Sequence, residues 1–121
     1  MGKKILIVDD DELILRILAD QLKAEGYTIV TANNGANAVD CAISEKPDII
    51  IMDVMLPDML GSDAVKRMQN STGAPDDLNI IFLSGIVLQK SEDKQMIHVG
   101  GKHYPAIPKP IDLDKLLKML S

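Results

Sequence analysis

Aromatic residues and cysteine are scarce in this sequence. Its 121 residues include no tryptophan, one phenylalanine, two tyrosines and a single cysteine, Cys41. One cysteine excludes an internal disulfide bond, which is typical of proteins kept in a reducing compartment. The small number of aromatic rings leaves little surface on which a planar cofactor such as a flavin could stack.

An excess of basic charge and a long apolar run are also missing. Thirteen lysines and arginines face 18 aspartates and glutamates, a net charge of −5 that argues against direct binding to nucleic acid or anionic lipid. No apolar stretch approaches the roughly 18 residues that span a bilayer. The apolar run near the N-terminus stops after four residues at Asp9, too short for a signal peptide. We therefore expect a soluble cytoplasmic protein with no membrane partner.

The remaining composition is that of one ordinary globular domain, which we expect to span residues 1–121. Hydrophobic residues make up 46% of the chain and charged residues 26%, so a single buried core can form. Short apolar runs alternate with longer amphipathic stretches. Strands are predicted at Lys4–Val8, Tyr27–Ala32, Asp48–Val54, Asn79–Leu83 and His103–Pro108, and helices at Glu12–Glu25, from Gly35 to about Lys46, and at Ser62–Gln69, Glu92–Val99 and Asp112–Leu120.

This alternation predicts a doubly wound α/β fold, flavodoxin-like in architecture. Five parallel strands in the order 2-1-3-4-5 would carry helices on both faces. In the first helix we expect one apolar stripe against the sheet, formed by Leu13, Ile14, Ile17, Leu18 and Leu22. Ligands of such sheets bind beyond the carboxyl ends of the strands, so the residues at those ends matter most.

Polar side chains follow four of the predicted strands. Asp9 and Asp10 follow the first strand, Asp53 ends the third, Ser84 follows the fourth and Lys109 follows the fifth. One acid after a strand is commonly a helix N-cap or a solvated loop residue. Five polar positions on one rim are hard to explain as caps.

Asp53 carries the strongest chemical argument. It interrupts the most hydrophobic segment, Ile49–Leu56, where an unpaired charge is costly, and nearby carboxylates would raise its proton affinity further unless a cation lies among them. Mg²⁺ prefers oxygen ligands of this kind. Lys109 would add a fixed positive charge and Ser84 a hydrogen-bond donor. Together these groups can stabilise a phosphoryl group in transit to a carboxylate.

Four separated motifs resemble those of response regulator receiver domains. They are Val8-Asp9-Asp10, Asp53 followed by Leu56-Pro57-Asp58 and Gly61, Ser84-Gly85, and Lys109-Pro110. They occur in the family's order along the whole chain. The resemblance implies a response regulator of two-component signal transduction or a phosphorelay, most similar to the stand-alone, chemotaxis-type regulators.

The resemblance assigns a role to each polar residue. Asp53 would be the phosphoacceptor and would bind Mg²⁺ together with Asp10 and the backbone carbonyl of Met55. Asp9 would hold the metal through water. Lys109 would contact the phosphoryl group, and its peptide bond to Pro110 is expected to be cis.

Further implications concern Ser84 and the partners. Ser84 would move to hydrogen-bond the phosphoryl group. The donor would be a histidine kinase or phosphotransfer protein. The output would be altered binding of a protein target by the surface of the fourth helix, fifth strand and fifth helix. The protein would catalyse only its own phosphorylation and dephosphorylation, as a monomer or weak dimer.

The sequence departs from the family pattern near the fifth strand and beside the acceptor. Ala106 stands where the family carries a switch aromatic. Tyr104, two residues earlier, either takes that role or packs at the edge of the strand. Met55 and Ile86 are bulky and apolar at positions that border the path of attacking water, which favours slow hydrolysis of the aspartyl phosphate; ordinary packing is the alternative.

Three other functions are weaker alternatives. A flavin carrier is disfavoured because Asp9–Glu12 would repel phosphate. A haloacid-dehalogenase-type phosphatase would use Asp9 and Asp11 but leaves Asp53 unexplained. A degenerate receiver would act as a phosphorylation-independent interaction module. His98 and His103 lack a metal-ligand spacing and are expected to be surface or edge residues.

Overall fold

The computed structural model describes residues 3–71, 78–85 and 96–120 as a three-layer α/β structure. A central sheet has the strand order β2-β1-β3-β4-β6-β5. Neighbouring strands from β2 to β6 are parallel, and β5 pairs with β6 in antiparallel register. The strands are β1 (Lys4–Val8), β2 (Thr28–Ala32), β3 (Ile49–Asp53), β4 (Ile80–Ser84), β5 (Met96–Val99) and β6 (Lys102–Pro108).

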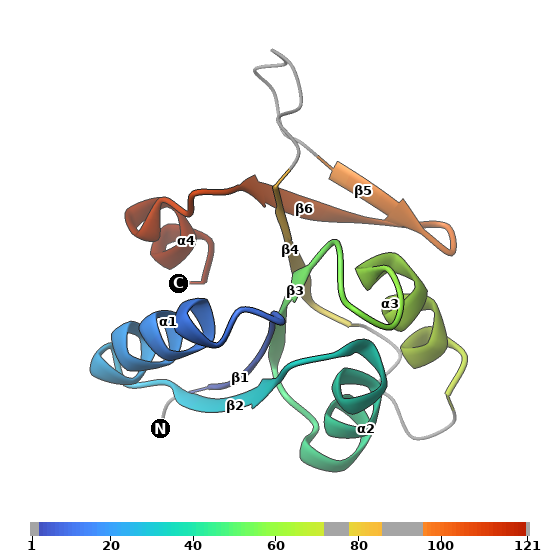
Figure 1. The fold of residues 1–121 in the computed structure, drawn as a ribbon, viewed down its shortest axis with the longest axis horizontal. Coiled ribbons are helices and arrows are strands. Elements are labelled where there is room, and N and C mark those ends of the chain that lie inside the picture. The colour runs from blue at the N-terminus through green and yellow to red at the C-terminus, as the bar shows by residue number, and fades with distance from the viewer. Residues whose placement is uncertain (1–2, 72–77, 86–95, 121) are drawn as a thin grey trace.

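Helices cover both faces of the sheet (Figure 1). One face carries α1 (Glu12–Ala24) and α4 (Leu113–Leu120), and the other carries α2 (Gly35–Glu45) and α3 (Gly61–Gln69). Local chemistry sets several of the helix ends. The Asp11 carboxylate accepts hydrogen bonds from the N–H groups of Leu13 and Ile14 at 3.0 and 3.4 Å, which caps α1. None of the helices in the described part of the chain is long and apolar enough to cross a membrane.

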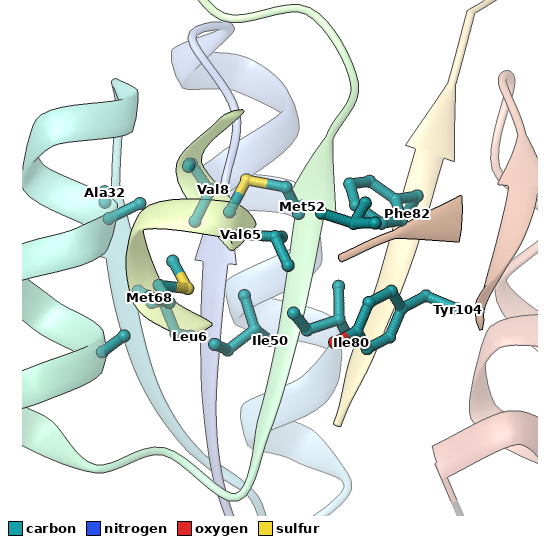
Figure 2. Close-up of a cluster of buried hydrophobic side chains, with 14 of the residues drawn as sticks. Leu6, Val8, Ala32, Ile50, Met52, Val65, Met68, Ile80, Phe82 and Tyr104 are labelled. Atoms are coloured by element: carbon teal, nitrogen blue, oxygen red, sulfur yellow. The ribbon is translucent and has the colours of Figure 1, made fainter. Parts of the chain in front are cut away.

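The core consists of two apolar layers separated by the sheet. Alternate residues of β1, β3 and β4 point to opposite faces, so almost every residue of these central strands is buried. Figure 2 shows the layer beneath α2 and α3, in which Ile50, Met52 and Phe82 pack together. The central strands that carry Asp9 and Asp53 at their carboxyl ends are therefore buried on both faces.

The predicted fold class is confirmed, with one strand added. The five parallel strands have the predicted order when β6 is counted as the predicted fifth strand. The Pro residues at 105 and 108 do not prevent β6 from pairing with β4 through Phe82–Ala106, Leu83–Ile107 and Ser84–Pro108. Asp112 caps α4 as expected: its carboxylate accepts a hydrogen bond from the Lys115 N–H at 3.3 Å.

The predicted helix at Glu92–Val99 is wrong in its described part. Residues 96–99 form β5, a strand at the sheet edge, and residues 92–95 lie outside the described residues. The reason is the turn that follows. Gly100 and Gly101 both adopt positive φ, +57° and +81°, as a two-residue hairpin turn of the primed type requires. This Gly-Gly signal joins β5 to β6 and overrides the weak helical pattern.

The apolar stripe predicted for α1 is also partly wrong. Leu18 and Leu22 are buried, but Leu13 is 63% exposed and Ile17 is 50% exposed. The helix has more apolar residues than one face can bury. The buried face consists of Leu15, Leu18, Ala19 and Leu22, which follow the i, i+3, i+4, i+7 spacing of a single helical stripe.

Candidate functional site

Three carboxylates converge at the carboxyl edge of the sheet. Asp9 and Asp10 follow β1, and Asp53 is the last residue of the neighbouring strand β3. One oxygen from each lies within 4.8 Å of the others. Asp9 and Asp53 are buried and Asp10 is exposed. The predicted convergence of these acids therefore exists, with one carboxylate open to solvent.

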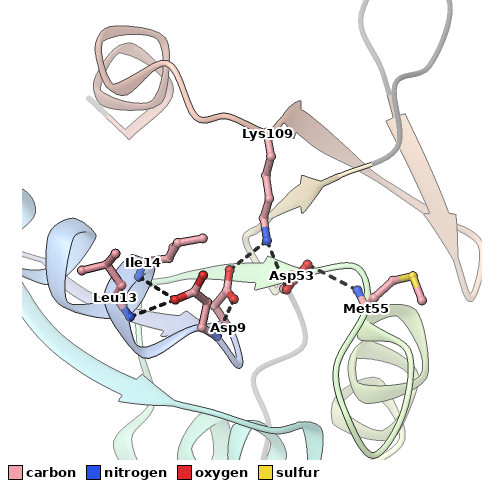
Figure 3. Close-up of polar contacts among 7 residues, drawn as sticks. Asp9, Leu13, Ile14, Asp53, Met55 and Lys109 are labelled. Atoms are coloured by element: carbon pink, nitrogen blue, oxygen red, sulfur yellow. Dashed lines mark hydrogen bonds and ion pairs between the residues drawn. The ribbon is translucent and has the colours of Figure 1, made fainter.

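Lys109 joins this cluster from the far side. Its Nζ lies 3.0 Å from Oδ2 of Asp9 and 3.2 Å from Oδ2 of Asp53 (Figure 3). The lysine follows β6, two strands away from β3 in the sheet. Its backbone N–H donates to the carbonyl oxygen of Ser84 at 2.8 Å, and its peptide bond to Pro110 is cis, as predicted. The lysine thus spans from the fifth parallel strand to the acids.

Backbone N–H groups orient the two buried carboxylates. The Asp11 N–H donates to Oδ1 of Asp9 at 2.9 Å, and the Met55 N–H donates to Oδ1 of Asp53 at 3.3 Å. Each buried acid therefore has one oxygen held by the loop that follows it and the other oxygen held by Lys109. This arrangement fixes the carboxylates before any ligand binds.

The site raises the pKa of Asp53. Burial disfavours the charged carboxylate, and the Asp9 carboxylate raises the pKa further, while Lys109 and the Met55 N–H lower it; the net direction is upward. Burial alone lowers the pKa of the Lys109 ammonium, but its contacts with Asp9 and Asp53 outweigh this and raise it above the ordinary value. The charges of Asp53, Asp9 and Lys109 therefore act on one another.

The net charge of the three carboxylates and Lys109 indicates which kind of ligand suits the site. Three carboxylates and one ammonium sum to a formal charge of −2, and two of the three carboxylates are buried. A divalent cation that accepts oxygen ligands would neutralise this charge, and the exposed Asp10 leaves the cluster accessible. The donor set and its charge therefore fit Mg²⁺.

A fourth acid, Asp58, connects the loop between β3 and α3 to the start of α2. Its carboxylate accepts hydrogen bonds from the N–H groups of Gly35 and Ala36 at 2.7 and 2.9 Å, at the first turn of α2. These backbone hydrogen bonds lower the pKa of Asp58. The sequence places Asp58 within a motif but gives no sign of this contact, because its partners lie 22 and 23 residues earlier in the chain.

We expect Asp58 to stabilise the fold in a pH-dependent manner. Because folding lowers its pKa, its contribution is complete above the ordinary aspartate pKa and is lost as pH falls through the folded value. Asp58→Ala should therefore lower the unfolding temperature at neutral pH, and Asp58→Asn should do so less because one acceptor oxygen remains. Thermal unfolding of the three proteins between pH 7 and strong acid would measure this. A difference that stays constant with pH would contradict it.

The sequence singles out three further residues near the acids: Ser84, Met55 and Ile86. Ser84 ends β4 and is buried, and Met55 is 60% exposed beside Asp53. Ile86 lies outside the described residues, so the predicted apolar barrier to water stays a prediction.

Ala106 is buried opposite Phe82. Tyr104 is also buried, with its ring edge-on to Phe82 at 6.1 Å and its hydroxyl accepting from Nε2 of Gln69 at 2.8 Å.

A family model described as the response regulator receiver domain matches residues 5–121 of this chain. Among curated proteins, the transcriptional regulatory protein KdpE of Mycobacterium tuberculosis is 34% identical over 116 residues, 96% of this chain and 48% of that protein. The regulatory protein PhoP of Bacillus subtilis is 45% identical over 69 residues, 57% of this chain and 29% of that protein. The chain thus spans about half or less of the length of these relatives.

Solved structures show the same fold over nearly the whole chain. Chemotaxis protein CheY4 of Vibrio cholerae is 27% identical with a TM-score of 0.79, covering 99% of this chain and 97% of that one. Response regulator TrrA of Thermotoga maritima, in complex with Mg²⁺ and BeF, is 27% identical with a TM-score of 0.78, covering 98% and 96%. A further structure contains TrrA with the histidine kinase ThkA, with the same identity and TM-score, covering 98% and 95%.

Proposed function

Because this chain belongs to the response regulator receiver domain family, we propose that it accepts a phosphoryl group on Asp53 and so acts in two-component signalling. The observation that carries the proposal is the contact of Lys109 with both buried acids at 3.0 and 3.2 Å. Neither a helix cap nor a solvated loop explains two buried carboxylates held at the rim of a sheet. A nucleophilic carboxylate held beside a fixed cation explains why these acids are buried there.

The proposed step is an in-line displacement. A carboxylate oxygen of Asp53 forms a bond to the phosphorus of the donor, while the bond from phosphorus to the donor's imidazole nitrogen breaks and its electron pair leaves with that nitrogen. Lys109 stabilises negative charge on the transferring group, because its ammonium already lies between Asp9 and Asp53. The Met55 N–H fixes the orientation of the attacking carboxylate.

Mg²⁺ is the proposed cofactor, and TrrA, a structural relative, is described with Mg²⁺ and BeF. Asp9, Asp10 and Asp53 would hold the ion, with the backbone carbonyl of Met55 as a further ligand. When bound, the ion supplies positive charge to the phosphoryl oxygens. Ser84 lies at the end of β4, next to β3, and is proposed to contact the phosphoryl group.

Receiver domains of this family act with histidine kinases, and one relative is described in complex with such a kinase. We infer that a histidine kinase or phosphotransfer protein supplies the phosphoryl group here. The receiver unit is proposed to be residues 1–121. Its output surface would consist of the β5–β6 hairpin and α4. In this hairpin, β5 takes the place of the end of the predicted fourth helix, Glu92–Val99. The degenerate, phosphorylation-independent module is the second candidate, favoured by the absence of an aromatic at Ala106.

Acetyl phosphate tests the proposal directly. The protein incubated with acetyl phosphate and Mg²⁺ should gain the mass of one phosphoryl group by intact mass spectrometry. Asp53→Ala and treatment with EDTA should each remove the adduct. Asp48→Ala is the matched control: Asp48 immediately precedes β3, whose last residue is Asp53, and its carboxylate contacts the Lys4 N–H away from the site.

The alternatives give different results. An adduct that persists in Asp53→Ala would assign the acceptor elsewhere and contradict the proposal. Some receivers refuse small donors, so a missing adduct leads to a Mg²⁺ titration with Asp10→Asn as the comparison. Binding that depends on Asp10 keeps the receiver function and calls for a kinase donor. Absence of binding supports the phosphorylation-independent module.

A further inference from the structure

Two histidines meet on the outer side of the β5–β6 hairpin. His98 and His103 are direct partners in the antiparallel register, and both are exposed. Nε2 of His98 lies 3.2 Å from Nδ1 of His103, and the ring centres are 4.0 Å apart at 74°. The two histidines lie one step from the two-residue turn, at a non-hydrogen-bonded position of the antiparallel pair. Residues at such positions have the closest Cα atoms and side chains of the two strands.

The hairpin holds the two backbones in place from its other side. The neighbouring residues Val99 and Tyr104 are buried against the sheet's α3 face. Nε2 of Gln69, on α3, donates to the Val99 carbonyl at 3.1 Å and to the Tyr104 hydroxyl at 2.8 Å. One side chain of α3 thus contacts both strands. Since side chains alternate along a strand, this anchoring directs His98 and His103 away from the core.

From this geometry we propose that His98 and His103 form a second metal site, for a borderline divalent transition-metal ion such as Zn²⁺ or Cu²⁺. Neutral imidazole nitrogen is a preferred ligand of these ions, whereas Mg²⁺ selects the oxygen cluster at the other site. With metal–nitrogen bonds of about 2.0 to 2.1 Å, a nitrogen separation of 3.2 Å subtends about 100 to 106° at the metal, close to tetrahedral. Water fills the remaining positions.

Binding requires only a small rearrangement. Pointing both ring nitrogens at one ion moves the ring centres from 4.0 Å to about 5 Å apart. Both rings are exposed, so they can rotate without disturbing the core. The bound ion would join β5 to β6, and β6 ends at Pro108, directly before Lys109. The site would thereby stabilise the hairpin at the edge of the proposed output surface.

Titration of the chain with a transition-metal ion tests this site independently of phosphorylation. Isothermal titration with Zn²⁺ or Cu²⁺ is carried out in excess Mg²⁺, which occupies the acidic cluster. We expect one ion per chain, tighter for Cu²⁺ than for Zn²⁺. His98→Gln and His103→Gln should each weaken binding at least tenfold. The double variant Asp10→Asn/Asp53→Asn should retain it, which separates this site from the acidic one.

Nitrogen-15 NMR of the imidazole rings supplies the second readout. Zn²⁺ should shift Nε2 of His98 and Nδ1 of His103 and should raise the unfolding temperature of the parent chain but of neither histidine variant. The metal-free variants should unfold with the parent, because the replaced rings are exposed. Equal metal affinity in the parent and both histidine variants, or loss of binding in the acidic double variant, would overturn the proposal. So would failure of the parent to bind either ion, which would leave the contact as an imidazole–imidazole hydrogen bond.

Discussion

Lys109→Met is expected to destabilise the protein by about 3 kcal/mol at neutral pH, because it leaves two buried carboxylates facing each other without a cation. Asp9 has no exposed surface and Asp53 is 5% exposed, so both carboxylates would stay largely desolvated without the ammonium. For a chain of this size the loss corresponds to a fall of about 10 °C in the unfolding temperature. Thermal or urea unfolding in metal-free buffer would measure it.

The electrostatic origin of this loss has a clear signature. Folding raises the pKa of Asp53, so its charged form costs stability as pH rises above the ordinary aspartate value, and protonation relieves that cost. The deficit of Lys109→Met should shrink as pH falls toward the folded pKa of Asp53. It should also shrink when Asp53→Asn is added, because the remaining acid then faces a neutral amide.

Lys4→Met is the matched control. Lys4 also pairs with an acid, Glu45, at 3.1 Å, but their side chains are 34% and 44% exposed. Its removal should cost about 0.5 kcal/mol or less, since exposed ion pairs contribute little. Equal losses in the two variants would assign the effect of Lys109→Met to packing of the lysine stem and would contradict the electrostatic explanation.

The sequence predicts this site well because its residues follow buried parallel strands. Asp9, Asp53 and Lys109 are 44 and 56 residues apart, yet each comes at the end of a predicted strand. The apolar pattern is clear for the first two strands and weaker for His103–Pro108, which contains two prolines. Parallel strands align their carboxyl ends, so the topology alone brings the three side chains to one edge. Neither hydrogen-bond partners nor the pairing of Lys109 with both acids can be predicted in this way, because they depend on side-chain geometry.

Elements at the periphery of the sheet are harder to predict. The pattern of Met96–Val99 is too short to distinguish a helix from an edge strand, and only the Gly100-Gly101 turn decides it. That error conceals the pairing of His98 with His103, which is invisible in a helical reading. In α1, the predicted stripe includes Leu13 and Ile17, whereas the buried face includes Leu15 and Ala19, and apolar residues at all four positions leave this choice to tertiary packing. Local patterns therefore determine neither the type of such a short edge element nor which face of an apolar helix is buried.

Gly61→Ala is expected to destabilise the protein by about 3 kcal/mol, against the direction of helix propensity. Gly61 is the first residue of α3, where replacement of glycine by alanine would ordinarily stabilise by up to about 1 kcal/mol. Here the new Cβ would overlap the carbonyl oxygen of Asp53 and would lie 2.9 Å from Cγ of Met52. Because the first of these neighbours is backbone, it cannot rotate away, and such overpacking typically costs 1 to 3 kcal/mol or more.

The same change should also impair the acidic site. The Gly61 N–H donates to the Val54 carbonyl at 2.7 Å, which closes the loop carrying Met55 over the end of β3. A shift of α3 to admit the methyl group would therefore displace both Asp53 and the Met55 N–H that orients it. We expect phosphorylation by acetyl phosphate to slow at least tenfold, measured at a temperature where the variant remains folded.

Gly85→Ala separates this crowding from a general effect of adding a methyl group. Gly85 follows Ser84 at the same edge of the sheet, but a Cβ placed there meets no atom of the described residues within 4 Å. Its unfolding free energy should change by less than about 0.5 kcal/mol. If Gly61→Ala were as stable as Gly85→Ala, α3 would have to tolerate the methyl group without moving. The close approach of Gly61 to the Asp53 carbonyl oxygen would then not determine the position of the proposed acceptor residue.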